Sequence, residues 1–185
     1  MSSSQSNSNK ELLNLPIRLT STVIPGFGRG STDLGIPTAN LSREHLTCNI
    51  PYDNLPCGIY WGFARIGNNN TNNNASELGR IHKAAISIGY NPTYNNTVKT
   101  IEPHLIASRK HPCRHSSKCG ETLFGDFYGE KIRVSVVGYL RPELPFEGLE
   151  KLIEAIKGDI VQSEMLGEGE DELVRMEKAW VESED

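Results

Sequence analysis

The chain has 185 residues, of which 37% are hydrophobic and 23% charged, and its formal net charge is −4. This composition excludes a disordered chain and a membrane-spanning one, and the acidic balance argues against a protein that holds nucleic acid through a general basic surface. The 17 glycines and 10 prolines indicate many turns, which favours short strands over a helical bundle.

Residues 1–14 are rich in Ser and Asn, so we expect a flexible leader before a single domain over 15–185. The leader has neither the apolar segment of a secretory signal nor the arginines of a transit peptide. The four cysteines are too few and too irregularly spaced for a disulfide framework. We therefore expect a cytoplasmic protein, with a mitochondrial fraction left open.

Five short segments are rich in β-branched or aromatic residues and are bounded by Gly, Pro or Asn. They predict strands over Ile17–Val23, Gly58–Ile66, Ile81–Gly89, Val98–Ile106 and Ile132–Leu140. In the last segment Ile132, Val134 and Val136 alternate with Arg133 and Ser135. That alternation is typical of a half-buried antiparallel strand.

The pattern changes after Pro145, where apolar residues recur about every 3.6 positions. The apolar positions are Phe146, Leu149, Leu152, Ile153, Ile156 and Ile160. They predict an amphipathic helix laid on the strands, and a second helix is predicted around Leu173, Met176 and Trp180. Strands followed by helices predict a mainly β fold, an antiparallel barrel or sandwich with C-terminal helices packed outside.

A glycine-rich segment follows the first predicted strand. Gly26, Gly28 and Gly30 alternate, which lets backbone amides turn towards one anion, and Arg29 stands beside them. The segment is not a dinucleotide fingerprint, because Ser31 stands where that motif needs glycine, and the chain has no Gly-Lys pair for a Walker A site. A plain turn is the alternative interpretation.

Thr38 and Asn40 come next and lie two residues apart, so an extended backbone places both side chains on one side. A hydroxyl and an amide oxygen are hard donors that suit Mg²⁺. The alternative is a Pro-Thr turn in which Thr38 and Asn40 make local hydrogen bonds to the backbone. The residues alone favour this alternative.

Several segments, taken in order, resemble the riboflavin kinase (flavokinase) family in its monofunctional eukaryotic form, from about Ile17 to Ile160. They are GFGRGSTDLGIPTAN, CGIYWGFARI, AAISIGYNPTY, KTIEPHLI, DFYGEKIRVSVVGYLRPE and FEGLEKLIEAIKGDI. The resemblance implies a small closed Greek-key β-barrel that transfers the γ-phosphoryl group of ATP to the 5′-hydroxyl of riboflavin. It implies Mg²⁺, with Zn²⁺ or Mn²⁺ as substitutes, and a monomer whose partners are riboflavin and ATP rather than nucleic acid or another protein.

The resemblance also assigns roles to residues. It implies Glu102 as the catalytic base and Thr38 and Asn40 as metal ligands. It implies nucleotide contacts at Gly26, Gly28, Arg29, Gly30, Thr32, Leu105, Ala107 and Tyr128, those of Leu105 and Ala107 being mostly through the backbone. It implies flavin contacts at Arg141, Leu144 and Phe146.

Glu102 also draws attention without the resemblance, because glutamate is unusual inside a strand. On the predicted strand it shares a face with Thr100 and His104. An exposed or salt-bridged edge residue is the alternative.

Two inserted loops depart from the family's pattern, at 67–76 and 109–120. The second carries His111, Cys113, His115 and Cys119, which are acceptable zinc ligands but lack paired Cys-x₂-Cys spacing, so an exposed basic loop is favoured.

Two other functions are considered, a flavin- or nucleotide-binding barrel without catalysis and a flavin reductase. The joint presence of Thr38, Asn40 and Glu102 argues against the first, and the lack of a nicotinamide signature argues against the second.

Overall fold

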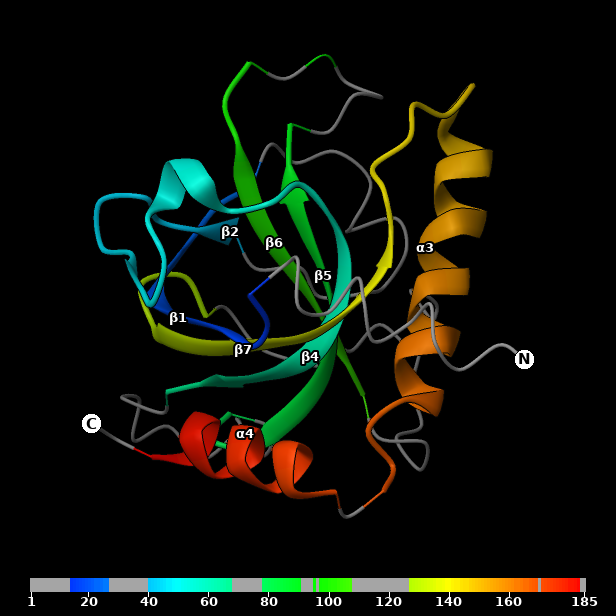
Figure 1. Ribbon diagram of the computed structural model, residues 1–185. Coiled ribbons are helices and arrows are strands. Elements are labelled where there is room, and N and C mark those ends of the chain that lie inside the picture. Colours follow the sequence, from blue (N-terminus) through cyan, green and yellow to red (C-terminus); the bar gives the residue numbers. More distant parts are fainter. Residues whose placement is uncertain are drawn as a thin grey trace.

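The computed structural model describes residues 14–26, 40–67, 78–90, 95, 97–107, 127–169 and 171–183. This part of the chain holds seven strands in one antiparallel sheet, followed by two helices (Figure 1). The strands are β1 (Ile17–Ile24), β2 (Asn40–Leu41), β3 (Thr47–Cys48), β4 (Gly58–Ile66), β5 (Ile81–Gly89), β6 (Thr100–Ile106) and β7 (Lys131–Arg141). A short 3-10 turn spans Tyr52–Asn54, and the helices are α3 (Leu149–Met165) and α4 (Glu172–Glu182).

The strand order is β2-β1-β7-β4-β5-β6, with β3 paired to β1. The consecutive antiparallel strands β4, β5 and β6 are followed by β7, which returns beside β4, and this is the Greek-key arrangement. The two end strands of the order, β2 and β6, come into contact, so the sheet curls into a nearly closed barrel. The predicted mainly β barrel with C-terminal helices is confirmed.

The barrel interior is filled by alternate residues of the strands, as period-2 patterning requires. Ile17 and Leu19 of β1 and Val134 and Val136 of β7 are fully buried there. Tyr60 of β4 also lies inside, where its hydroxyl donates a hydrogen bond to the Pro56 carbonyl at 2.8 Å. A buried phenol therefore keeps a polar partner.

Two predicted boundaries are wrong by a few residues. The strand predicted from Val98 begins at Thr100, because Lys99 is tied to the 52–55 turn: its carbonyl accepts the Tyr52 hydroxyl, and its amine donates to the Leu55 carbonyl at 3.0 Å. The helix predicted to start near Phe146 begins at Leu149. Gly148, with φ of 93°, takes a left-handed conformation that keeps the preceding residues out of the helix.

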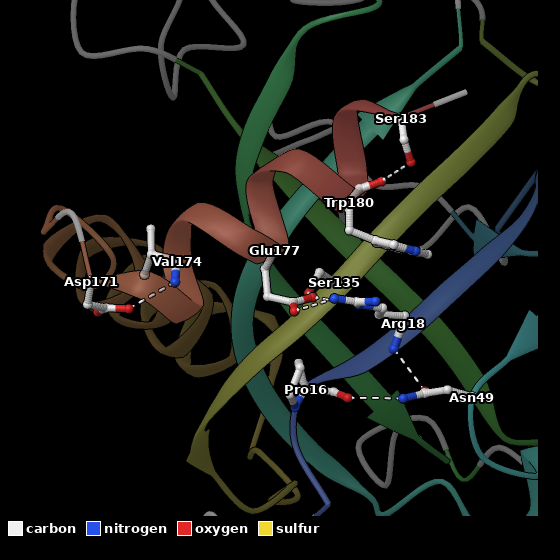
Figure 2. Close-up of polar contacts among 9 residues, drawn as sticks. All are labelled: Pro16, Arg18, Asn49, Ser135, Asp171, Val174, Glu177, Trp180 and Ser183. Atoms are coloured by element: carbon white, nitrogen blue, oxygen red, sulfur yellow. Dashed lines mark hydrogen bonds and ion pairs between the residues drawn. The ribbon is translucent and has the colours of Figure 1, made fainter. Parts of the chain in front are cut away.

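Helix α4 covers the outer face of β7 and β4 (Figure 1). Ser135 is therefore fully buried, and the prediction of a half-buried last strand is incomplete, since it did not anticipate this cover. Figure 2 shows Glu177 pointing from α4 towards Arg18 and Ser135. The Arg18 guanidinium donates to the Glu177 carboxylate at 2.8 and 3.0 Å, and the Ser135 hydroxyl donates to it at 2.7 Å.

Helix α3 packs on the outside of the sheet, chiefly against β5 and β4. Ile160 of α3 packs on Ala85 of β5 and Ile106 of β6, with Ile153 and Ile156 beside them. The spacing of the apolar residues along the predicted helix produces this contact.

Lys83 of β5 caps the C-terminal end of α3. Its ammonium donates to the carbonyls of Glu164 at 2.7 Å and Leu166 at 2.8 Å, and to the Glu168 carboxylate at 2.8 Å. A cation satisfies the unpaired carbonyls at a helix C-terminus and stabilises the helix dipole. The lysine thus fixes α3 to the sheet.

We expect Lys83→Met to lower the free energy of unfolding by about 1–2 kcal/mol. Methionine keeps the apolar part of the side chain but loses the ammonium that caps the helix. Thermal unfolding should show a melting temperature about 2–8 °C lower. Lys151→Met is the matched control, since Lys151 makes an exposed pair with Glu147 and should cost under about 0.5 kcal/mol. Equal melting of the Lys83 variant and the wild type would show that the cap contributes nothing.

Candidate active site

The predicted base, Glu102, lies on the outer face of β6. Ile101 and Leu105 of this strand point into the barrel core, whereas Thr100, Glu102 and His104 alternate with them on the opposite face. The shared face that the sequence predicts is confirmed.

Burial raises the pKa of Glu102 above its ordinary value, and the negative charge of Glu143 raises it further. A hydrogen bond from the Thr100 hydroxyl acts in the opposite direction. Desolvation is the largest of these influences, because a charged carboxylate loses hydration when it is covered. Glu102 is therefore a stronger base than a carboxylate in water.

His104 occupies the next position on the same face. Burial lowers its pKa to about 4, so the imidazole is neutral at physiological pH. Its Nδ1 atom is buried and has no hydrogen-bond partner in the described part of the chain. His104 therefore carries no positive charge that would neutralise Glu102.

Two of the predicted flavin residues meet between β7 and α3. The Arg141 guanidinium forms a bidentate ion pair with Asp159 of α3, at 2.7 and 2.6 Å, and lies 5.6 Å from the centre of the Phe146 ring. Leu144, between them in sequence, is 49% exposed. Arg141 thus fixes the 141–146 segment to the covering helix.

Sequence reasoning missed Asp159 and Glu143. Asp159 is buried although it is charged, and Glu143 follows Arg141 by two residues within the quoted LRPE motif. An acidic residue amid the apolar positions of a predicted helix was the available signal for Asp159.

Three of the predicted nucleotide and metal residues gather at the end of β1. Asn40 pairs with Ile24, and its buried side chain lies against Gly26, where a Cβ atom would overlap its amide. The turn that carries Tyr128 is joined to the same strand end through Val23, whose carbonyl accepts the Gly129 N–H at 2.9 Å. Tyr128 itself is 55% exposed and so is available to a ligand.

Leu105 and Ala107 come at the far end of β6 with buried side chains. Any contact that these two residues make to a nucleotide would therefore be through the backbone, and their role as nucleotide contacts stays a prediction. The barrel closes where β2 contacts β6, and we call this contact the seam. Gly26 and Asn40 therefore lie across the seam from β6. The remaining predicted residues, Gly28, Arg29, Gly30, Thr32 and Thr38, lie outside the described residues, as does the 109–120 insert with its candidate zinc ligands.

The amide nitrogen of Asn40 is its atom nearest Gly26, and the amide oxygen on the same group is a hard donor of the kind that fits Mg²⁺ with other positions kept for phosphate and water. Across the described ranges no group of three or more His, Cys, Asp or Glu side chains could hold a metal ion. Within the same ranges no helix is long and apolar enough to cross a membrane.

A Greek-key barrel that carries a carboxylate of raised pKa on the outer face of β6 is thus the framework of the candidate active site. A family model described as riboflavin kinase matches residues 13–166. The chain belongs to the riboflavin kinase family, as its motifs predicted.

Individual relatives agree with this assignment. The chain is 43% identical over 149 residues to the riboflavin kinase of Homo sapiens, covering 80% of this chain and 79% of the relative. It is 38% identical over 158 residues to that of Aspergillus fumigatus, covering 78% and 72%. The crystal structure of riboflavin kinase from Trypanosoma brucei superposes with a TM-score of 0.54 at 20% identity, covering 92% of this chain and 88% of that one, and so shares its fold.

Proposed function

We propose that this protein transfers the γ-phosphoryl group of ATP to the 5′-hydroxyl of riboflavin and forms FMN and ADP. The observation that carries the proposal is the place of Glu102, on the outer face of β6 with a raised pKa. Of the predicted flavin residues, Arg141 ends β7 and Leu144 and Phe146 lie in the segment that leads into α3, and two of the predicted nucleotide residues, Gly26 and Tyr128, lie near the end of β1. The chain's membership of the riboflavin kinase family supports the same reaction.

The chemistry asked of the protein is chiefly positioning and charge stabilisation. As the riboflavin oxygen bonds to the γ-phosphorus, the bond from that phosphorus to the bridging oxygen of ADP breaks. The hydroxyl proton passes to the Glu102 carboxylate, whose raised pKa favours acceptance. Backbone amides of the glycine segment would bind the phosphates.

Thr38 and Asn40 would hold Mg²⁺, which when bound neutralises charge on the phosphates. We also propose that the protein is a monomer and that it acts in the cytoplasm.

The direct test is incubation of the purified protein with riboflavin and MgATP, followed by chromatographic measurement of FMN and ADP. We expect the two products in equal amounts. Flavin binding without ADP formation would contradict the proposal and leave a non-catalytic barrel, and oxidation of a nicotinamide by bound flavin would indicate a reductase.

A Thr38→Val variant tests the metal ligands. We expect the dissociation constant of MgATP to rise about 10- to 100-fold, because one charge-assisted contact to the cation is lost. Riboflavin affinity, measured by quenching of flavin fluorescence, should stay within about twofold. Thr47→Val, at an exposed position on β3, is the matched control. Unchanged MgATP affinity in the Thr38 variant would remove this residue from the metal site.

A further inference from the structure

Glu143 joins the end of β7 to the end of β5. It lies just beyond β7, and its Oε2 atom accepts a hydrogen bond from the Tyr90 N–H at 3.0 Å. Tyr90 is the first residue after β5. A carboxylate that accepts a backbone N–H holds it more firmly than a neutral acceptor does. The carboxylate therefore fixes the point at which the chain leaves β5.

The fold leaves a space for this carboxylate at Gly89, the last residue of β5. A Cβ atom at Gly89 would overlap both carboxylate oxygens of Glu143. Any larger residue there would have to displace the acid. Glu143 thus occupies the space that a side chain at position 89 would fill.

Gly89 and Glu143 are connected to Glu102 through the paired strands β5 and β6. Gly89 stands opposite Thr100, and Ser87 stands opposite Glu102. The Thr100 hydroxyl hydrogen-bonds the Glu102 carboxylate and also lies 3.4 Å from the Gly89 carbonyl. Glu143, Gly89, Thr100 and Glu102 therefore form one continuous set of contacts across two strands.

Three cations on β5, before β6 and at the end of β7 are held by other partners in the described part of the chain. On β5, the Lys83 ammonium is held by the C-terminal carbonyls of α3, and before β6 the Lys99 ammonium donates to the Asp53 and Leu55 carbonyls. At the end of β7, Arg141 is paired with Asp159 of α3.

One further titratable side chain shares the outer face of β6 with Glu102. His104, on the same strand, is neutral at physiological pH because burial lowers its pKa. Among the described residues, Glu143 is the group whose charge acts on Glu102.

We propose that Glu143 is a positioning residue for phosphoryl transfer, which fixes the ends of β5 and β6 and acts through its charge on the base, Glu102. The proposal rests on the proposed function, in which Glu102 takes the proton of the riboflavin hydroxyl. Two like charges close together disfavour the ionised form of each, so the second carboxylate strengthens the base.

The Glu143→Gln variant removes the charge and keeps an oxygen for the Tyr90 N–H. We expect the acidic limb of the pH profile of kcat/KM to move to lower pH, because Glu102 loses a neighbouring negative charge. The plateau rate should fall about two- to fivefold, since a weaker base accepts the proton less readily. Glu154→Gln, at an exposed position on α3, should leave both unchanged.

The Gly89→Ala variant approaches the same contact from the other side. Its methyl group should displace the Glu143 carboxylate and lower kcat about tenfold with a smaller change in KM. If the two residues act as one unit, adding Glu143→Ala to Gly89→Ala should lower kcat no further than about twofold, whereas independent sites would show multiplied losses. Thermal melting of each variant checks that the barrel is folded.

Titration of the Glu102 carboxyl by carbon NMR gives a readout that does not depend on turnover. The proposal expects the pKa of Glu102 to fall in the Glu143→Gln variant. An unchanged titration, or an unchanged pH profile in an active enzyme, would overturn it. A wild-type protein that makes no FMN would instead overturn the proposed function, and the NMR titration would still decide whether the two carboxylates are coupled.

Discussion

Replacement of Glu102 by glutamine is expected to slow FMN formation by about 10²- to 10⁴-fold, or about 3–5 kcal/mol of activation free energy. Glutamine has nearly the same shape as glutamate, but its amide cannot accept a proton at neutral pH. Initial rates at saturating riboflavin and MgATP measure the effect. A rate equal to that of the wild type would remove Glu102 from the role of base.

The same variant carries a prediction about stability. Because burial raises the pKa of Glu102, the native state binds a proton more tightly than the unfolded chain does. The contribution of this proton is fully present below the unfolded pKa and is lost as pH rises through the folded pKa. The glutamine variant, which is always neutral, should therefore melt at a higher temperature than the wild type at pH 8.

The difference between the two melting temperatures should close as the pH is lowered towards about 4, near the ordinary pKa of glutamate. Glu182→Gln, at an exposed position on α4, is the control and should show no such trend. A glutamine variant at position 102 that melts below the wild type at pH 8 would contradict the desolvation of Glu102.

Replacement of Glu177 by alanine is expected to lower the free energy of unfolding by about 3 kcal/mol. Glu177 is 1% exposed and receives hydrogen bonds from Arg18 and Ser135, so its loss leaves a cation and a buried hydroxyl without their partner (Figure 2). We place the cost at the lower end of the range for buried pairs because the Arg18 side chain is 34% exposed and regains water. The melting temperature should fall by about 6–12 °C.

Two further variants make this prediction specific. Glu177→Gln keeps two polar atoms for Arg18 and Ser135 and should lose less than the alanine variant. Glu172→Ala, at an exposed position in the first turn of α4, should cost under about 1 kcal/mol. If all three variants unfold alike, the buried ion pair does not hold α4 on the barrel.

Much of the fold was predictable because the core faces of the strands repeat every two residues. The strand predicted over Gly58–Ile66 has the bounds observed for β4, and the one predicted over Ile81–Gly89 has those of β5. β2 and β3 were not predicted, because each is two residues long and is defined by its pairing with β1 rather than by a pattern of its own. Such pairing depends on residues distant in the chain and produces no local sequence pattern.

The candidate site divides in the same way. The face shared by Thr100, Glu102 and His104 follows from strand periodicity alone. The partners of Arg141 and Glu102 do not, because Asp159 and Glu143 reach them from α3 and from the segment after β7. These contacts depend on how far the sheet curls and where the helix lies on it.

The sequence by itself determined the class of fold and the family, since both rest on residue patterns that are read along the chain. Its composition and acidic charge already favoured a strand-rich protein that does not bind nucleic acid. Only the tertiary structure decided that Glu102 is a strengthened base, because a pKa depends on burial and on charges from distant segments. It also decided that a glycine at the end of β5 leaves room for the carboxylate of Glu143, a relation between two positions that no local pattern contains.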